Sequence, residues 1–293
     1  MRRRLLPQDI AARYVRAGTR EELLRIAAAR AKRRDLEYRL IWQRNAAVAR
    51  ALAERVRPGD VVVGQYGACL EAFRRAKDAG ARTVLDYPIA LEGYVREILD
   101  EEARRRPEFA ETLTGAGNAT RPEHRRRIEE EVRLADAVVV GSSFARQSFA
   151  GAADLSRVHV VPYGVDATAF TPAAMPRTAG PLRVLFAGQV TQRKGIAYVF
   201  DAMRMLDPRR FRLTVVGSLS GARDAVAWYD DLYGRIVRAA PGDMPAIYRS
   251  HDVLVLPSIV EGSALVVLEA MASGLPVIVT PSAGAEAVRD GVD

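Results

Sequence analysis

Two glutamates near the end of the chain stand at a spacing that could bind a phosphorylated sugar. Glu261 and Glu269 are separated by seven residues and lie between two short apolar runs, Val253–Leu256 and Val277–Val279. Such runs, bounded by Pro, Ser or Gly, are typical of strands buried on both faces of a parallel sheet. The segment 264–272 between them is apolar except for Glu269, which predicts a buried helix. Because a buried carboxylate is costly by itself, we expect a polar partner for Glu269.

The start of this helix is a candidate phosphate site. The turn that enters it consists of Gly262, Ser263, Ala264 and Leu265, and the first turn of a helix offers free N–H groups at the positive end of the helix dipole. A diphosphate bound there would have a carboxylate on either side as an acceptor for hydroxyl groups, which is the layout of a nucleotide sugar. The alternative interpretation is a structural helix with one capping and one salt-bridged glutamate.

A second loop combines glycines with two cations. Gly188 follows a strand-like apolar run, Arg193 and Lys194 come shortly before a predicted helix at residues 196–206, and Gly217 ends the next predicted strand. The loop has neither the ending of a Walker loop nor the spacing of a dinucleotide fingerprint. Because doubly wound sheets bind ligands at the carboxyl ends of their strands, we expect this loop near the glutamate motif. The alternative is that the basic residues are simply solvated.

Three motifs together resemble the GT-B glycosyltransferases of the family 4 type, the glycosyl transferases group 1. They are the E-x7-E helix before Gly-Leu-Pro-Val, the loop G-x4-R-K-G, and the run P-x-G-V-D…F-x-P at residues 162–172. The resemblance implies a hexosyltransferase that moves a sugar from a nucleotide-sugar donor to a glycan or lipid-linked acceptor in polysaccharide biosynthesis. It also implies retention of the anomeric configuration, and we expect no metal and no other cofactor.

The resemblance also assigns roles to individual residues. It implies that Glu261 contacts the hydroxyls of the donor sugar, that Glu269 binds the ribose and that Lys194 binds the diphosphate. Family members often carry an Arg directly after the first glycine of the basic loop, whereas this chain has Gln189 there, which leaves Arg193 as the substitute. The predicted catalytic residues are therefore Glu261, Lys194 and Arg193. The predicted donor-binding residues are Gly188, Gly217, Gly262, Ser263, Ala264, Leu265 and Glu269.

Predicted helices and strands alternate along the rest of the chain. Before residue 171 we expect helices at 21–57, 71–79, 91–113 and 121–134, and strands at 61–66, 82–86, 137–141 and 157–161. This alternation predicts an α/β fold, with two Rossmann-like, doubly wound parallel-sheet domains that face each other across a cleft. We expect the strand at 61–66 to be buried and the helical region 91–113 to lie at the surface.

The domain boundary is predicted in a segment rich in Pro, Ala, Gly and Thr at residues 171–181. Residues 1–170 would then form an acceptor-side domain that begins with basic helices, and residues 171–293 a nucleotide-sugar-binding domain. Members of the family that this chain resembles continue past the position of Asp293 into another strand and further helices. We therefore expect the second domain to be incomplete in this sequence.

The charge of the chain is concentrated near its beginning. The net charge is +8, and residues 1–57 alone hold 16 Lys and Arg against 6 Asp and Glu. Such a basic segment favours an anionic partner, such as a membrane surface, an acidic acceptor or nucleic acid. No basic strand with interleaved aromatic residues accompanies the charge, so nucleic acid is not expected. The alternative is a solvated helical surface without a partner.

The remaining composition favours the cytoplasm. Cys69 is the only cysteine, so no internal disulfide can form. No apolar run approaches the length needed to span a bilayer. We therefore expect a cytoplasmic protein, either soluble or peripheral on the inner face of the membrane. The three histidines, His124, His159 and His251, have no partner at metal-ligand spacing, so no metal site is predicted.

One position departs from the resembling family. Family members commonly carry a histidine of the active site in a Thr-Val-His-Asp sequence at the end of a strand, whereas this chain reads Thr83-Val84-Leu85-Asp86. Leu85 cannot perform the chemistry of a histidine. This departure keeps a second interpretation open, in which the chain is a non-catalytic relic of the fold that binds a sugar nucleotide or a partner protein.

Overall fold

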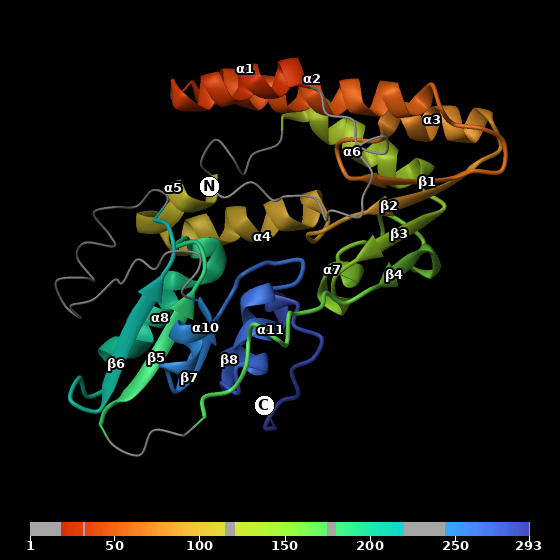
Figure 1. Cartoon of the computed structure of the whole chain (residues 1–293). Coiled ribbons are helices and arrows are strands. Elements are labelled where there is room, and N and C mark those ends of the chain that lie inside the picture. Colours follow the sequence, from red (N-terminus) through yellow and green to blue (C-terminus); the bar gives the residue numbers. More distant parts are fainter. Residues whose placement is uncertain (1–18, 32, 115–120, 175–179, 220–243, 293) are drawn as a thin grey trace. The chain divides into compact units, whose positions relative to one another are not determined.

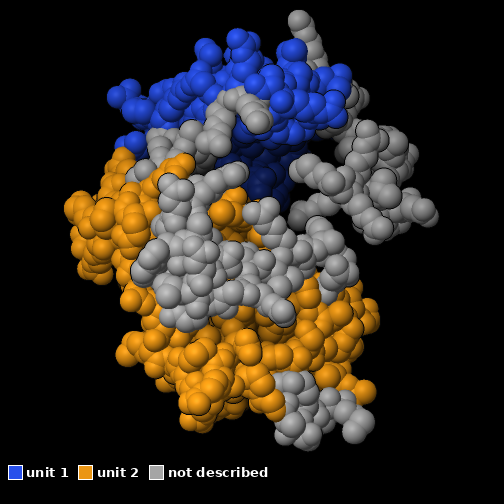
Figure 2. Space-filling model, turned by 90° about the vertical axis from the view of Figure 1, so that its left-hand side faces the viewer, with its two compact units in different colours: residues 1–85, 121–136 blue, residues 86–120, 137–293 orange. Residues whose placement is uncertain are grey.

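The computed structural model describes residues 19–31, 33–114, 121–174, 180–219 and 244–292 (Figure 1). The chain divides into two compact units, which Figure 2 colours separately: residues 1–85 with 121–136, and residues 86–120 with 137–293. We call them unit 1 and unit 2. The domain boundary predicted at residue 171 stays a prediction. Residues 1–18 and 32 of the basic segment predicted to dock on a membrane lie outside the described residues. The sequence also predicts a loop at residues 218–225, most of which lies outside the described residues.

Unit 1 contains two helices in the basic segment, where the sequence left one long helix or two abutting ones open. Its elements are α1 (Thr19–Arg30), α2 (Arg34–Ala53), β1 (Val61–Gln65), α3 (Leu70–Asp78), β2 (Arg82–Asp86, of which Asp86 belongs to unit 2) and α6 (Pro122–Leu134). Strand β1 lies next to β2. The expectation that β1 is buried is wrong, because the side chains of Val61 and Val63 are 50% and 64% exposed while Val62 is buried. One face of this strand packs and the other does not.

The loop between β1 and α3 is held by a buried carboxylate from α6. Glu131 is completely buried and accepts hydrogen bonds from the backbone N–H groups of Gly67 at 2.5 Å, Cys69 at 3.0 Å and Leu70 at 2.9 Å. These donors include the first N–H groups of α3, which have no partner within the helix itself. The carboxylate thus occupies the anion-binding position that the turn after β1 offers.

Unit 2 begins with a helical segment that was expected at the surface. Its first elements are α4 (Glu92–Arg105), the 3-10 turn η2 (Pro107–Phe109), α5 (Ala110–Thr114), β3 (Ala137–Val140), α7 (Ser143–Gln147), the 3-10 turn η3 (Leu155–Arg157) and β4 (Val158–Val160). Strands β3 and β4 pair in parallel. The expectation of a surface location for residues 91–113 holds for one face only: Arg96 and Arg104 are exposed. The other face is buried, with Leu99, Glu102, Phe109 and Leu113.

A second sheet forms the rest of unit 2. Its strands are β5 (Leu182–Ala187), β6 (Phe211–Val216), β7 (Val253–Leu256) and β8 (Val277–Val279), arranged in the order β6-β5-β7-β8. All three strand pairs are parallel. The helices of this part are α8 (Ile196–Arg204), α10 (Met244–Arg249) and α11 (Leu265–Ala272), and its 3-10 turns are η4 (Gln192–Lys194) and η5 (Pro281–Ala283). The α/β pattern expected from the alternation of elements is confirmed here.

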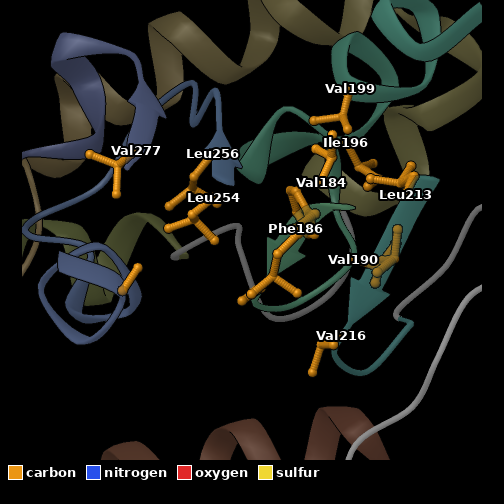
Figure 3. Close-up of a cluster of buried hydrophobic side chains, with 14 of the residues drawn as sticks. Val184, Phe186, Val190, Ile196, Val199, Leu213, Val216, Leu254, Leu256 and Val277 are labelled. Atoms are coloured by element: carbon orange, nitrogen blue, oxygen red, sulfur yellow. The ribbon is translucent and has the colours of Figure 1, made fainter. Parts of the chain in front are cut away.

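The core of the second sheet consists of aliphatic and aromatic side chains. Phe186 on β5 and Leu254 and Leu256 on β7 are fully buried, and Ile196 of α8 packs into the same cluster (Figure 3). Phe109 of η2 also belongs to this cluster, although it precedes β5 by more than seventy residues. The segment that follows α4 is therefore built into the core of the second sheet. No helix in the described part of the chain is both long and apolar enough to cross a membrane.

We expect Glu131→Gln to destabilise the chain. Glutamine keeps one acceptor oxygen, so it places an N–H₂ group against backbone donors and loses a hydrogen bond to a charged acceptor, which costs about 1.5–3 kcal/mol. Urea denaturation should show this loss in the free energy of unfolding. The matched control is Glu130→Gln on the same helix, which affects ion pairs with the exposed Arg74 and Arg133 and should cost less than about 1 kcal/mol. Equal losses in the two variants would contradict the capping role.

Candidate functional site

The strand order of the second sheet creates a crevice at one edge. The order β6-β5-β7-β8 reverses between β5 and β7, since β6 lies on one side of β5 and the later strands on the other. The registers pair Ala187 with Val216 and Leu256 with Val279, so the carboxyl ends of the strands meet at one edge. Open α/β sheets bind ligands at such a reversal. The loops after β5 and β7 flank it.

These two loops are in direct contact. Ile259 donates its backbone N–H to the carbonyl of Arg193 at 2.8 Å, and the guanidinium of Arg193 donates to the carbonyl of Val260 at 3.2 Å. Gly195 has a φ of 73°, and a Cβ there would lie 2.0 Å from the carbonyl oxygen of Pro257. Only glycine fits at this position, because it lets the two backbones approach so closely.

The three residues predicted as catalytic lie together. Arg193 Nη1 and Lys194 Nζ each lie 2.7 Å from the same oxygen, Oε1, of Glu261. Glu261 is only 8% exposed, so water screens this cluster weakly. Burial lowers the pKa of Lys194, and the neighbouring Glu261 carboxylate opposes that shift. Two cations facing one carboxylate leave a net positive charge at the edge of the sheet, which favours an anionic ligand.

Two predicted glycines lie beside this cluster. A Cβ on Gly217 would meet the carbonyl oxygen of Gly188 at 1.6 Å, and a Cβ on Gly188 would lie 3.7 Å from the side chain of Lys194. The backbone N–H of Gly188 donates to the carbonyl of Val216 at 2.9 Å. The pair therefore keeps the ends of β5 and β6 close together and keeps that wall of the site free of side chains.

The start of α11 is less open than its sequence predicts. Ser142 Oγ donates to the carbonyl of Gly262 at 2.5 Å, and a Cβ on Gly262 would lie 1.9 Å from the carbonyl oxygen of Pro88. The backbone N–H of Ala264 donates to the carbonyl of Ala283 at 3.0 Å. The expectation of free N–H groups is therefore wrong for Ala264.

The same helix is also less buried than expected. Its first residue, Leu265, is 46% exposed, and Ser263 before it is partly exposed. Glu269 is likewise only half-buried, so the prediction of a helix that is buried all round is wrong. Ser263 and Leu265 are thus the positions of this turn that a ligand can approach.

The expected polar partner of Glu269 is Tyr248. The Tyr248 hydroxyl, fully buried on α10, donates to Glu269 Oε2 at 2.8 Å. Burial raises the pKa of Glu269, and this hydrogen bond opposes the shift. Burial likewise raises the pKa of Tyr248, so this phenol keeps its proton. No spacing in the sequence pointed to Tyr248, whose only local sign was a tyrosine shortly before β7.

Two further polar residues near the basic loop were also missed. Gln192 directly precedes the two cations and is fully buried, and Glu102 of α4 is its hydrogen-bond partner. No spacing rule links a glutamate in one helix to a loop ninety residues later. Leu85, at the position where the resembling family carries a histidine, is fully buried.

Part of this chain is similar to known glycosyltransferases. Residues 181–293 match the family model described as "Glycosyl transferases group 1". A D-inositol 3-phosphate glycosyltransferase from Arthrobacter sp. (strain FB24) is 34% identical over 195 residues, which are 58% of this chain and 46% of that protein. One from Paenarthrobacter aurescens (strain TC1) is 37% identical over 198 residues, or 58% of this chain and 48% of that protein. The chain thus spans about half the length of these relatives.

A solved structure extends the likeness to both sheets. The catalytic domain of starch synthase IV from Arabidopsis thaliana, bound to ADP and acarbose, superposes with a TM-score of 0.60 at 14% identity. The match covers 87% of this chain and 64% of that chain. At this identity the likeness concerns the fold, which is that of the GT-B glycosyltransferases. The family match is carried by residues 181–293, so this part of the chain is similar to the group 1 glycosyl transferases.

Proposed function

We propose that this chain transfers a sugar from a nucleotide-sugar donor to a glycan or lipid-linked acceptor. The observation that carries the proposal is the cluster of Arg193, Lys194 and Glu261 at the strand reversal of the second sheet. The cluster lies within the segment that matches the family model. A net positive, weakly screened site at this place suits the diphosphate of such a donor.

We assign different roles in the reaction to the two cations and to Glu261. The bond between the anomeric carbon and the diphosphate oxygen breaks, and negative charge develops on the departing diphosphate. Arg193 and Lys194 would stabilise that charge as hydrogen-bonding cations, without a metal. Glu261 would accept hydrogen bonds from the sugar hydroxyls and hold the anomeric carbon against the acceptor oxygen. That oxygen forms the new bond to the anomeric carbon, and its proton passes to the departing diphosphate. The family resemblance adds retention of configuration to the proposal.

The names of the relatives suggest a specific acceptor to test first. They are named for D-inositol 3-phosphate, a phosphorylated polyol. We include this compound beside glycan and lipid-linked acceptors in the proposal, and a transfer assay with a panel of nucleotide sugars would distinguish among them.

The buried Leu85 favours a second function, in which the chain binds a sugar nucleotide without transferring the sugar. A leucine that is fully enclosed in β2 offers no group for proton transfer or hydroxyl positioning. Binding of a nucleotide sugar in calorimetry, with no transfer to any acceptor of the panel, would support this second function.

We expect Lys194→Ala to weaken the binding of a nucleoside diphosphate and to lower turnover. Losing one charge-assisted hydrogen bond costs about 1.5–3 kcal/mol, or roughly 10-fold to 150-fold in affinity. Calorimetry with the free nucleoside diphosphate measures the effect, and Arg209→Ala, on a side chain that is 89% exposed, is the matched control. EDTA should leave the native chain active. Activity that disappears with EDTA and returns with magnesium would mean that a metal carries the charge of the leaving group.

We expect Glu269→Gln to reduce nucleotide affinity and to remove part of its pH dependence. Burial raises the pKa of Glu269 above its ordinary value of 4.5, so the charged acceptor for the ribose is lost as the pH falls through this raised pKa. The ratio of the two dissociation constants, variant over native, should therefore approach one at low pH and rise as the pH increases. Tyr248 can still donate to the glutamine, so the fold should persist. A ratio that stays constant with pH would argue against a ribose-binding role.

The proposal includes docking of the basic first segment on anionic lipid. The described part of this segment exposes Arg30, Arg33, Arg50 and Arg55 on or beside α1 and α2, together with Leu23. Each cation near an anionic surface contributes about 1 kcal/mol, and salt screens it. We expect co-sedimentation with phosphatidylserine vesicles that weakens in Arg50→Ala/Arg55→Ala and at high salt. Equal binding to neutral vesicles would contradict the electrostatic account.

A further inference from the structure

Gln192 is the most constrained residue of the basic loop. Its side-chain Nε2 donates to Glu102 Oε1 at 2.6 Å, and its Oε1 accepts from the backbone N–H of Ala197 at 3.0 Å. Its own backbone N–H donates to Thr112 Oγ1 at 2.9 Å. The side chain is fully buried, so each of these polar atoms depends on its protein partner. Gln192 is thus fixed from three sides, one residue before Arg193.

Glu102 is the partner that fixes the side chain of Gln192 from outside the second sheet. This carboxylate on α4 is 4% exposed, and it also accepts from the Tyr198 hydroxyl at 2.8 and 3.1 Å. Burial and the contact with Glu102 raise the pKa of Tyr198 to about 12, so this phenol remains a donor at neutral pH. Hydrogen bonds from Gln192 and Tyr198 offset the cost of burying the charge.

The helix that carries Glu102 is itself anchored to the second sheet. Arg106, which follows α4, forms an ion pair with Asp201 of α8 at 2.6 Å, and its guanidinium lies 5.5 Å from the centre of the Tyr198 ring. Phe109 is part of the core of the sheet. Glu102 therefore acts from a rigid support, as a residue that positions a site must.

We propose that Glu102 and Gln192 form a positioning pair that sets the place of Arg193 and Lys194 at the strand reversal and thereby the affinity for the diphosphate. This inference rests on the proposed function. Gln192 and the two cations share one 3-10 turn, η4 (Gln192–Lys194), so a shift of Gln192 moves both cations. Charge-assisted hydrogen bonds depend on distance and angle, so displaced cations would bind the diphosphate less well.

An exchange of the two side chains tests the pair. Gln192→Glu places a second carboxylate where Nε2 now lies 2.6 Å from Glu102, and two carboxylates at that distance cannot both be charged without repulsion. The double variant Glu102→Gln/Gln192→Glu restores one amide and one carboxylate in reversed order. Tyr198 can then donate to the new amide oxygen, and Ala197 to the new carboxylate.

We expect Gln192→Glu to raise the dissociation constant for a nucleoside diphosphate about tenfold or more. The double variant should lie within about threefold of the native chain, since charge and hydrogen bonds are restored. The matched control is Met203→Ala, which removes a buried core side chain of α8 and leaves the hydrogen bonds of the pair in place. At an equal loss of thermal stability, the control should bind more tightly than Gln192→Glu. A double variant as weak as Gln192→Glu, or a control as weak, would overturn the inference.

Hydrogen exchange separates this inference from the proposed function, because it needs no ligand. The backbone N–H groups of residues 192–197 should exchange faster in Gln192→Glu and at the native rate in the double variant. Native rates in both variants would overturn the positioning role, whereas a native chain that binds no nucleoside diphosphate would overturn the proposed function. Should Gln192→Glu fail to fold, Tyr198→Phe provides the second test. It removes one donor to Glu102 and should change affinity and exchange in the same direction by a smaller amount.

Discussion

The structure of the candidate site depends on one shared oxygen. Glu261 Oε1 lies 2.7 Å from both Arg193 and Lys194, and this contact joins the loop after β5 to the loop after β7. One carboxylate neutralises only one of the two cations, so the cluster keeps a net positive charge that water screens weakly. An anionic ligand that binds here must share the two cations with Glu261. Hydrogen bonds from the cations to the ligand would replace some of those to Glu261, and this carboxylate could then accept hydrogen bonds from the sugar hydroxyls.

The fold provides this contact through strand order and glycine. The reversal between β5 and β7 opens the crevice, and Gly195 and Gly217 allow backbone segments to approach to distances that no side chain would permit. Hydrogen bonds between the two loops then hold them together. The segment after α4 adds a support from earlier in the chain, because Phe109 enters the core and Glu102 binds the loop that carries the cations.

Sequence patterns predicted the parts of this arrangement that depend on local spacing. The apolar runs predicted the strands of the second sheet, and the motif around Glu261 placed the carboxylate on the same edge as Lys194. The contacts that depend on packing between distant segments could not be predicted. Tyr248 beside Glu269 and Glu102 beside Gln192 have no sequence spacing that links them. The exposed face of β1 and the hydrogen-bonded N–H of Ala264 were missed, because a pattern of residue types does not reveal which neighbours cover a segment.

The most direct test of the central claim compares two ligands that differ by one phosphate. In the presence of EDTA, calorimetry measures the affinity of the native chain for a nucleoside diphosphate and for the matching monophosphate. If Arg193 and Lys194 hold the second phosphate, charge-assisted hydrogen bonds worth about 1.5–3 kcal/mol should make the diphosphate bind at least roughly tenfold more tightly. Equal affinities for the two nucleotides would contradict the account, since the cations at the strand reversal would then have no part in binding the donor.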